Sequence, residues 1–118
     1  MGEFEELLNR MKTIRAKKNR DYGNSFIESY NDKDMGNHTI VFDIARKTGR
    51  IKNILLREKG KTQVEDETIE DTFIDLAIIS LNCVIALRAR KNKEEINGRD
   101  NKRYKDMHKV LALQKRNQ

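Results

Sequence analysis

The 118-residue sequence contains no proline, no tryptophan and only one cysteine. A single cysteine, Cys83, cannot form a disulfide framework or a thiolate metal site, so we expect it to be a small core residue. No stretch approaches the roughly 18 uninterrupted apolar residues of a membrane span. Residues 1–6 are acidic, whereas a signal peptide would begin with basic residues. These absences predict a soluble, cytoplasmic protein with no membrane partner.

The sequence is instead rich in charge, with 37% charged residues against 36% hydrophobic ones. Such a composition can form a core if the chain is mostly helical, because an amphipathic helix needs only three or four apolar residues in every two turns. The absence of proline permits long helices. The length limits the chain to one small domain.

The net charge of +6 is unevenly distributed. Residues 86–118 contain 11 basic and four acidic residues, which leaves 14 basic and 15 acidic residues in the rest of the chain. Residues 10–20 carry six positive charges and no negative one, whereas residues 65–75 carry six negative charges and no positive one. A basic excess favours an acidic partner such as nucleic acid, but this excess is confined to the C-terminal third.

Apolar residues recur at helical spacing through most of the chain. Glycines and polar stretches separate the periodic segments. The pattern predicts an all-α protein, a small helical bundle of four to five helices. The expected helices cover residues 3–19, 26–30, 39–57 and 66–90, with a last helix beyond a break at Gly98.

The helix expected over residues 66–90 differs from the others because its residues after Asp75 are apolar almost all round. A helix of this kind is normally surrounded by protein. We therefore expect it to be the central, buried helix of a bundle formed by residues 1–90. Residues 91–118 are expected to form a basic helical extension of that bundle.

Three carboxylates, Glu67, Asp71 and Asp75, are spaced by four residues and therefore share one helical face. Oxygen ligands on a helix suit Mg²⁺, which keeps several waters and bridges to substrate phosphates. Burying an unpaired carboxylate is costly, so a cationic group should face this stripe. The alternative is that Glu67 and Asp71 are solvated and stabilise the positive end of the helix dipole.

The helix expected over residues 39–57 also carries charges one turn apart, because Lys47 follows Asp43 and Arg50 follows Arg46. A guanidinium presents a planar fork that matches phosphate. This face could therefore hold phosphates or pair with the carboxylates. The alternative is a solvated face with salt bridges between neighbouring turns.

A polar turn follows the first helix. Residues 17–26 combine basic residues, amides, a glycine and two aromatic rings. Tyr22 or Phe26 could stack on a base while Asn19 and Asp21 read its edge. The alternative is a helix end where basic residues meet the dipole and the rings dock the turn on the core.

At these residues the chain resembles a small family of phages and mobile elements, the nucleotide modification associated domain family. The similarity lies in Lys18-Asn-Arg-Asp-Tyr-Gly-Asn-Ser-Phe26, in Arg46-Lys47 with Arg50, and in Glu67-Thr-Ile-Glu-Asp-Thr-Phe-Ile-Asp-Leu-Ala77. The chain departs from the pattern at Arg46, where the family has an aspartate. That family is in turn similar to all-α nucleoside triphosphate pyrophosphatases of the MazG and dimeric dUTPase type, which hold Mg²⁺ with acidic pairs.

The resemblance implies a Mg²⁺-dependent nucleotide pyrophosphohydrolase, acting for example on a deoxynucleoside triphosphate, or a nucleotide-binding relative with a degenerate site. The carboxylate stripe would hold Mg²⁺, and Glu70 would act as the base. Lys47 and Arg50 would neutralise charge that builds up on the phosphates. The residues expected to contact the nucleotide are Lys18, Asn19, Asp21, Tyr22, Phe26 and Arg46.

Two other functions stay open. A non-catalytic accessory protein could contact nucleic acid weakly through the basic extension, and without sequence specificity because that segment has few aromatic residues. The final helix could instead join subunits. A small bundle with an apolar helix benefits from forming a homodimer or a higher homo-oligomer.

Overall fold

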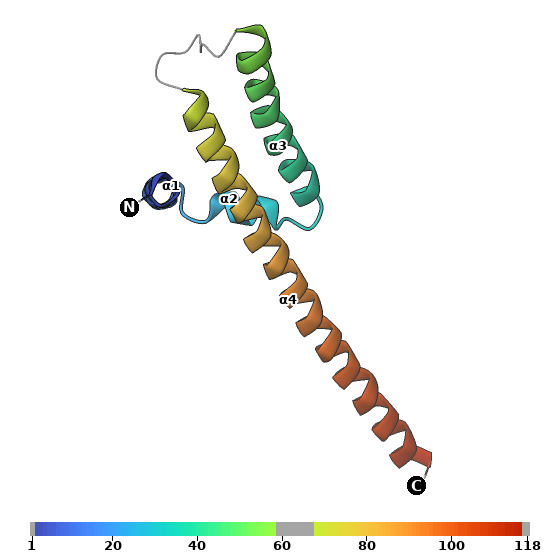
Figure 1. Ribbon diagram of the computed structural model, residues 1–118. Coiled ribbons are helices and arrows are strands. Elements are labelled where there is room, and N and C mark those ends of the chain that lie inside the picture. The colour runs from blue at the N-terminus through green and yellow to red at the C-terminus, as the bar shows by residue number, and fades with distance from the viewer. Residues whose placement is uncertain (1, 59–67, 117–118) are drawn as a thin grey trace. The chain divides into compact units, whose positions relative to one another are not determined.

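The structure, a computed structural model, describes residues 2–58 and 68–116. These residues form helices and no strand, which confirms the predicted all-α fold (Figure 1). The chain divides into two compact units, residues 1–87 and 88–118. The helices are α1 (Glu3–Tyr22), α2 (Ser25–Tyr30), α3 (Gly36–Lys52), the π-helical turn η1 (Asn53–Arg57) and α4 (Ile69–Arg116).

Local signals explain where α1 ends and α3 begins. Gly23 takes a φ of +62°, which favours glycine, and its N–H donates to the carbonyl of Asn19 at 2.7 Å. The helix therefore runs to Tyr22 rather than to the predicted residue 19. Before α3, Asp32 Oδ2 accepts a hydrogen bond from the N–H of Met35 at 2.7 Å. This turn starts the helix three residues earlier than predicted.

The predicted break at Gly98 is wrong, because α4 continues through that residue. A glycine in a helix interior costs about 1 kcal/mol relative to alanine. Strong helix formers on both sides, among them Glu94, Glu95 and Lys102, offset this local cost. The loop predicted between the third and fourth helices falls mainly on residues 59–67, outside the described part of the chain.

The core of the first unit is small. Among the described residues, Tyr30 of α2 is the largest fully buried side chain, with 1% of its surface exposed. Cys83 is buried beside it, as predicted for a small core residue. Burying an apolar side chain stabilises the fold by about 1.5–3 kcal/mol, so these contacts hold α2, α3 and α4 together. The partly buried residues packed against this cluster are Ile27, Ile40 and Ile79.

The prediction that the helix over residues 66–90 is buried on most sides is wrong. Phe73, Leu81 and Val84 are 47%, 48% and 43% exposed. Within the described residues, the neighbouring helices cover one side of α4 and leave these side chains uncovered. The residues buried on the covered side are Thr72, Ile74, Ile78, Asn82, Cys83 and Ala86.

One property of α4 bears on the expected absence of a membrane span. Its most apolar 18-residue window has a mean hydropathy of 1.7. By length and composition the helix could therefore cross a membrane. About a third of that window is buried within the chain. The core helix of a soluble protein passes the same test, so this property alone does not separate the two cases.

Candidate functional site

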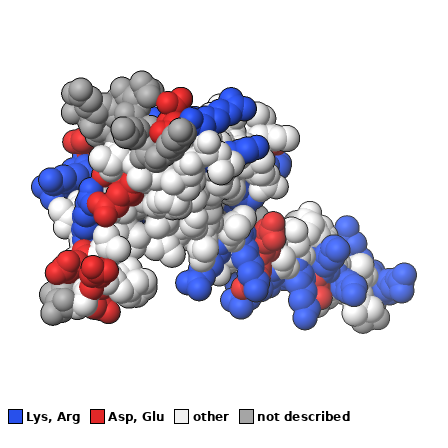
Figure 2. Space-filling view, turned by 45° about the horizontal axis from the view of Figure 1, so that its top comes forward, with Lys and Arg blue, Asp and Glu red and all other residues white. Residues whose placement is uncertain are grey.

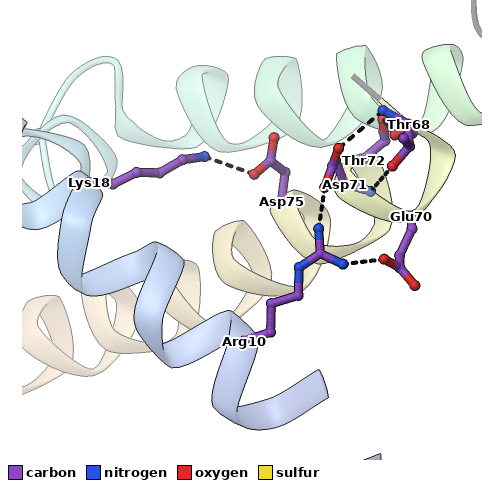
Figure 3. Close-up of polar contacts among 7 residues, drawn as sticks. All are labelled: Arg10, Lys18, Thr68, Glu70, Asp71, Thr72 and Asp75. Carbon is purple, nitrogen blue, oxygen red and sulfur yellow. Dashed lines mark hydrogen bonds and ion pairs between the residues drawn. The ribbon is translucent and has the colours of Figure 1, made fainter. Parts of the chain in front are cut away.

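The basic side of α1 faces the acidic start of α4 (Figure 3). The guanidinium of Arg10 pairs with Glu70 and, at 2.6 Å, with Asp71 Oδ1. Two turns later along α1, Lys18 Nζ donates to Asp75 Oδ1 at 2.8 Å. Members of the two opposed blocks of charge therefore pair across two helices. This pairing removes the cost of leaving half-buried carboxylates alone.

Asp75 joins three helices. Its Oδ1 accepts from Lys18 of α1, and its Oδ2 accepts from Lys47 of α3 at 3.3 Å. The side chains of Asp75 and Lys47 are only 26% and 22% exposed, so solvent screens this pair less than it screens a surface pair. One carboxylate shared by two ammonium groups leaves the trio with a net positive charge.

Asp71 is engaged differently, in a capping box at the start of α4. Thr68 Oγ1 accepts a hydrogen bond from the N–H of Asp71, and Asp71 Oδ2 accepts one from the N–H of Thr68, both at 3.1 Å (Figure 3). These hydrogen bonds, together with the charge of Arg10, hold the pKa of Asp71 below its usual value of 3.8. The sequence interpretation missed this cap, although a threonine three residues before an aspartate is its signature.

A cavity of about 170 Å³ lies beside Asp75 and is lined by residues of α1, α2, α3 and α4. Four cationic and two carboxylate side chains give its walls a net charge of +2. Asn19 and Asn82 add amide groups, and Phe26 adds an aromatic wall. The charged residues of the lining are Arg15, Lys18, Asp43, Arg46, Lys47 and Asp75.

Asp43 is held in place by two neighbours. Tyr30 donates to Asp43 Oδ2 at 2.7 Å, and Arg46 pairs with Asp43 Oδ1 at 3.5 Å. Burial, reinforced by the Asp43 carboxylate, raises the pKa of Tyr30 far above its usual range. Asp43 in turn orients Arg46, whose guanidinium also lies 5.8 Å from the centre of the Phe42 ring.

Two further arginines bind polar side chains of α4. Arg15 Nε donates to Asn82 Oδ1 at 3.0 Å, at the wall of the cavity. Arg50 Nε donates to Oγ1 of the buried Thr72 at 3.0 Å and does not line the cavity. The sequence interpretation missed Arg15. Its signal is a position one turn before Asn19, on the same face of the helix.

The sequence profile of a family described as nucleotide modification associated domain 1 matches residues 18–87. The match covers more than half of the chain and includes every residue that lines the cavity except Arg15. The chain belongs to this family. No curated protein and no solved structure matches it.

The nucleotide modification associated domain gathers part of the predicted site. Tyr22 is 60% exposed, and its ring lies edge-on to the ring of Phe26 at a centroid distance of 5.3 Å. Glu67 lies outside the described residues. The predicted residues that line the cavity are Lys18, Asn19, Phe26, Arg46, Lys47 and Asp75. Those that do not line it are Asp21, Tyr22, Arg50, Glu70 and Asp71.

The predicted Mg²⁺ site needs oxygen atoms that can turn towards a metal. In the domain as described, both oxygens of Asp71 and both oxygens of Asp75 already accept hydrogen bonds. Among the described residues, no group of three acidic, histidine or cysteine side chains could hold a metal ion. A divalent cation would also meet the positive charges of Lys18 and Lys47. As described, Asp71 and Asp75 therefore do not fit a resident Mg²⁺ ion, whereas Lys18 and Lys47 suit an anion.

Proposed function

We propose that this domain binds a nucleotide, with the phosphate groups in the cavity beside Asp75. The observation that carries the proposal is the lining of the cavity, where four Lys and Arg side chains outnumber two carboxylates. An anionic phosphate neutralises the excess positive charge of that lining. The description of the family, nucleotide modification associated, supports a nucleotide as the source of the phosphate.

The cations that bind phosphate in this proposal are of two kinds. Lys18 and Lys47 supply point charges, and Arg15 and Arg46 supply planar forks that match phosphate oxygens. Asp75 keeps the two ammonium groups in position because it binds one with each oxygen. Side chains that are already ordered lose less entropy when the ligand arrives. Asp75 is therefore a positioning residue rather than a metal ligand.

The base of the nucleotide packs on the aromatic wall of the cavity. Phe26 is 37% exposed and is supported edge-on by Tyr22. Stacking of a base on an aromatic side chain contributes about 1–3 kcal/mol. The amide of Asn19 offers a donor and an acceptor for the edge of the base or for the sugar.

Hydrolysis is a further proposal beyond binding. In this reaction water attacks the α-phosphorus of a deoxynucleoside triphosphate and the bond between the α-phosphorus and the bridging oxygen breaks. The products are the monophosphate, pyrophosphate and a proton released to solvent, and Lys18 and Lys47 neutralise charge on the phosphates. Glu70, the predicted base, pairs with Arg10 and does not line the cavity, so it cannot reach a water beside the phosphates without giving up this pair. Any Mg²⁺ arrives bound to the phosphates of the nucleotide, because it is commonly held through substrate phosphates.

We further propose that the protein acts in the cytoplasm as a soluble protein. The covered side of α4 carries Asp75 and Asn82, which pair with cations from α1 and α3. Charged groups of this kind are rare and costly in the apolar interior of a membrane. A nucleotide ligand would also be present in the cytoplasm.

Titration calorimetry of the full chain with a deoxynucleoside triphosphate and its monophosphate tests binding. Lys47→Met removes a cation and is expected to weaken binding about 10- to 100-fold, because a hydrogen bond to a charged group contributes about 1.5–3 kcal/mol. Lys52→Met, at the exposed end of the same helix, is the matched control and should bind like the wild type. Equal losses in the two variants would contradict the assignment of the cavity.

A second function is favoured by the second unit. Residues 88–118 contain 11 basic and four acidic residues. From residue 91 to residue 116 every side chain is exposed, and Lys and Arg crowd this part of α4 (Figure 2). We infer weak contact with the backbone of nucleic acid, without sequence specificity.

The salt dependence of binding to duplex DNA tests this contact. Each phosphate that a variant no longer neutralises should reduce the log–log slope by about 0.9. The triple variant with Gln at Lys102, Arg103 and Lys105 is therefore expected to have a shallower slope than the wild type. A variant with Gln at Lys33, an exposed lysine of the first unit, is the control. An unchanged slope in the triple variant would exclude the contact.

A further inference from the structure

The side of α4 that faces away from the cavity is apolar, exposed and regularly spaced. Phe73, Ala77, Ser80, Val84 and Leu87 follow one another at intervals of four and three residues. This is the spacing at which two helices pack along a common line. All five residues are at least partly exposed, and the three largest side chains are 43–48% exposed. These five residues are named the α4 seam.

The seam continues onto α1 through an apolar groove of about 420 Å³. Its walls combine Phe73 and Ala77 of the seam with apolar side chains of α1. Two of these, Phe4 and Leu7, are 71% and 42% exposed. A continuous exposed apolar surface of this kind marks an interaction site in a soluble protein.

Charge at the two ends of the seam indicates which partner fits. From Phe73 to Leu87 the helix rises about 21 Å, and none of the seam residues is charged. Glu70 and Asp71 precede the seam and share one cation, Arg10, so that end keeps a net negative charge. Arg88 and Lys91 follow the seam in the sequence. A second copy in antiparallel orientation places the acidic end of one seam against the basic end of the other. A parallel copy places like charges together.

The sizes of the side chains also suit an antiparallel second copy, with a two-fold axis near Ser80. Phe73 then faces Leu87 of the second copy, and Ala77 faces Val84. The small residues near the axis allow the two backbones to approach closely. Ser80 Oγ donates to the carbonyl of Leu76 at 2.8 Å, so its hydroxyl keeps a hydrogen bond when water is excluded.

We propose that the α4 seam forms a two-fold, antiparallel homodimer interface, which is independent of the nucleotide site on the other side of the helix. Lipid is the competing occupant, because α4 is long and apolar enough to cross a membrane. The covered side of the helix is unsuited to a lipid environment, because Asp75 and Asn82 hydrogen-bond there to lysine and arginine side chains. A helix with one polar and one apolar side fits a protein partner instead.

Cysteine cross-linking of the full chain tests the register. Ser80→Cys places a thiol next to the axis, so mild oxidation is expected to give a disulfide-linked dimer. Val84→Cys is the matched control, because the antiparallel pair separates its two thiols by about 12 Å along the helix. A disulfide requires Cα atoms within about 4.4–6.8 Å. The wild type should not cross-link, because Cys83 is buried.

Two outcomes of the cross-linking would overturn the proposal. Cross-linking of both variants would show a parallel pair, and cross-linking of neither would show that the seams do not meet. The expected result is a dimer of Ser80→Cys alone.

Sedimentation equilibrium provides a second, independent readout. The wild type is expected to sediment at twice the 13.9 kDa of one chain. Val84→Glu places a charge within the seam and should sediment as a single chain. Val41→Glu, which changes a 66% exposed valine of α3, is the matched control and should remain dimeric.

A wild type that sediments as one chain would overturn the interface. So would a wild type that floats with lipid vesicles and does not self-associate. Circular dichroism should show that both glutamate variants keep their helices. If Val84→Glu fails to fold, the Ser80→Cys cross-link still decides the question because it leaves Val84 unchanged.

Discussion

The two sides of α4 have opposite relations to the rest of the chain. On the cavity side, Asp75, Asn82 and Thr72 each hydrogen-bond to a cationic side chain of α1 or α3. On the seam side, Phe73 and Val84 are nearly half exposed and apolar. The polar groups of this helix therefore organise contacts within the chain. Much of its apolar surface is not covered by the described part of the chain.

This division has a physical basis. A polar group removed from water needs a partner at a defined distance and angle, and leaving it unsatisfied costs about 1–3 kcal/mol. Helices that belong to the same chain can supply such partners in fixed positions. Burial of apolar surface is non-directional and depends mainly on area. A second copy of the chain can therefore cover the α4 seam as effectively as another helix of the same chain.

The largest expected difference between the two sides is in stability. Ile78 on the cavity side is 4% exposed, so Ile78→Ala is expected to lower the free energy of unfolding by about 2–5 kcal/mol. Leu81 on the other side is 48% exposed, and Leu81→Ala should have a small effect in dilute solution. Urea denaturation followed by circular dichroism measures both.

Measuring the stability of both variants at several protein concentrations separates the two sides of the helix further. If the exposed side is covered in a dimer, the cost of Leu81→Ala should grow at concentrations where the wild type dimerises, because association stabilises the folded state. The cost of Ile78→Ala should change less. Equal costs for the two variants at every concentration would remove the distinction between the two sides.

A smaller effect is expected at the start of α4, where Asp71 caps the helix. Its pKa is depressed by Thr68 and Arg10, so its contribution to stability is present above its usual value of 3.8 and is lost as the pH falls through the lower folded-state pKa. Asp71→Asn should therefore lower the melting temperature at neutral pH. The difference from the wild type should shrink on acidification below about pH 4.

The control for this prediction is Asp100→Asn, an exposed aspartate of the second unit. Its melting temperature should follow that of the wild type at each pH. A difference between Asp71→Asn and the wild type that stays constant down to strongly acidic pH would show that the carboxylate charge is not what stabilises the cap.

Much of the fold could be predicted because its signals are local. Apolar periodicity predicted the first helix, and the glycine after Tyr22 indicated its end. The excess of carboxylates near Asp75 indicated that cations must face it, and Lys18 and Lys47 do so. These inferences need only the spacing of residues and the cost of an unpaired charge.

The remaining features depend on which surfaces meet. The sequence places Arg15 on the same helical face as Asn19, but it does not show that α1 turns this face towards Asn82. Hydrophobicity predicted that the helix over residues 66–90 is buried, but it cannot indicate whether the chain itself covers every side of that helix. At Gly98 a weak local signal for a break was outweighed by the helix-forming residues around it.

The most direct test of the cationic phosphate site is the binding of a deoxynucleoside triphosphate to the wild type and to Asp75→Asn, each measured with Mg²⁺ and with a chelator. The substitution keeps the size of the side chain and removes one negative charge from the cavity lining. A phosphate site built from Lys18, Lys47 and their neighbours predicts binding in the chelator. Asp75→Asn should weaken this binding without abolishing it, because the two ammonium groups lose the carboxylate that positions them but keep their charge. Binding that requires Mg²⁺ and disappears in Asp75→Asn would contradict the cationic phosphate site and would make Asp75 a metal ligand.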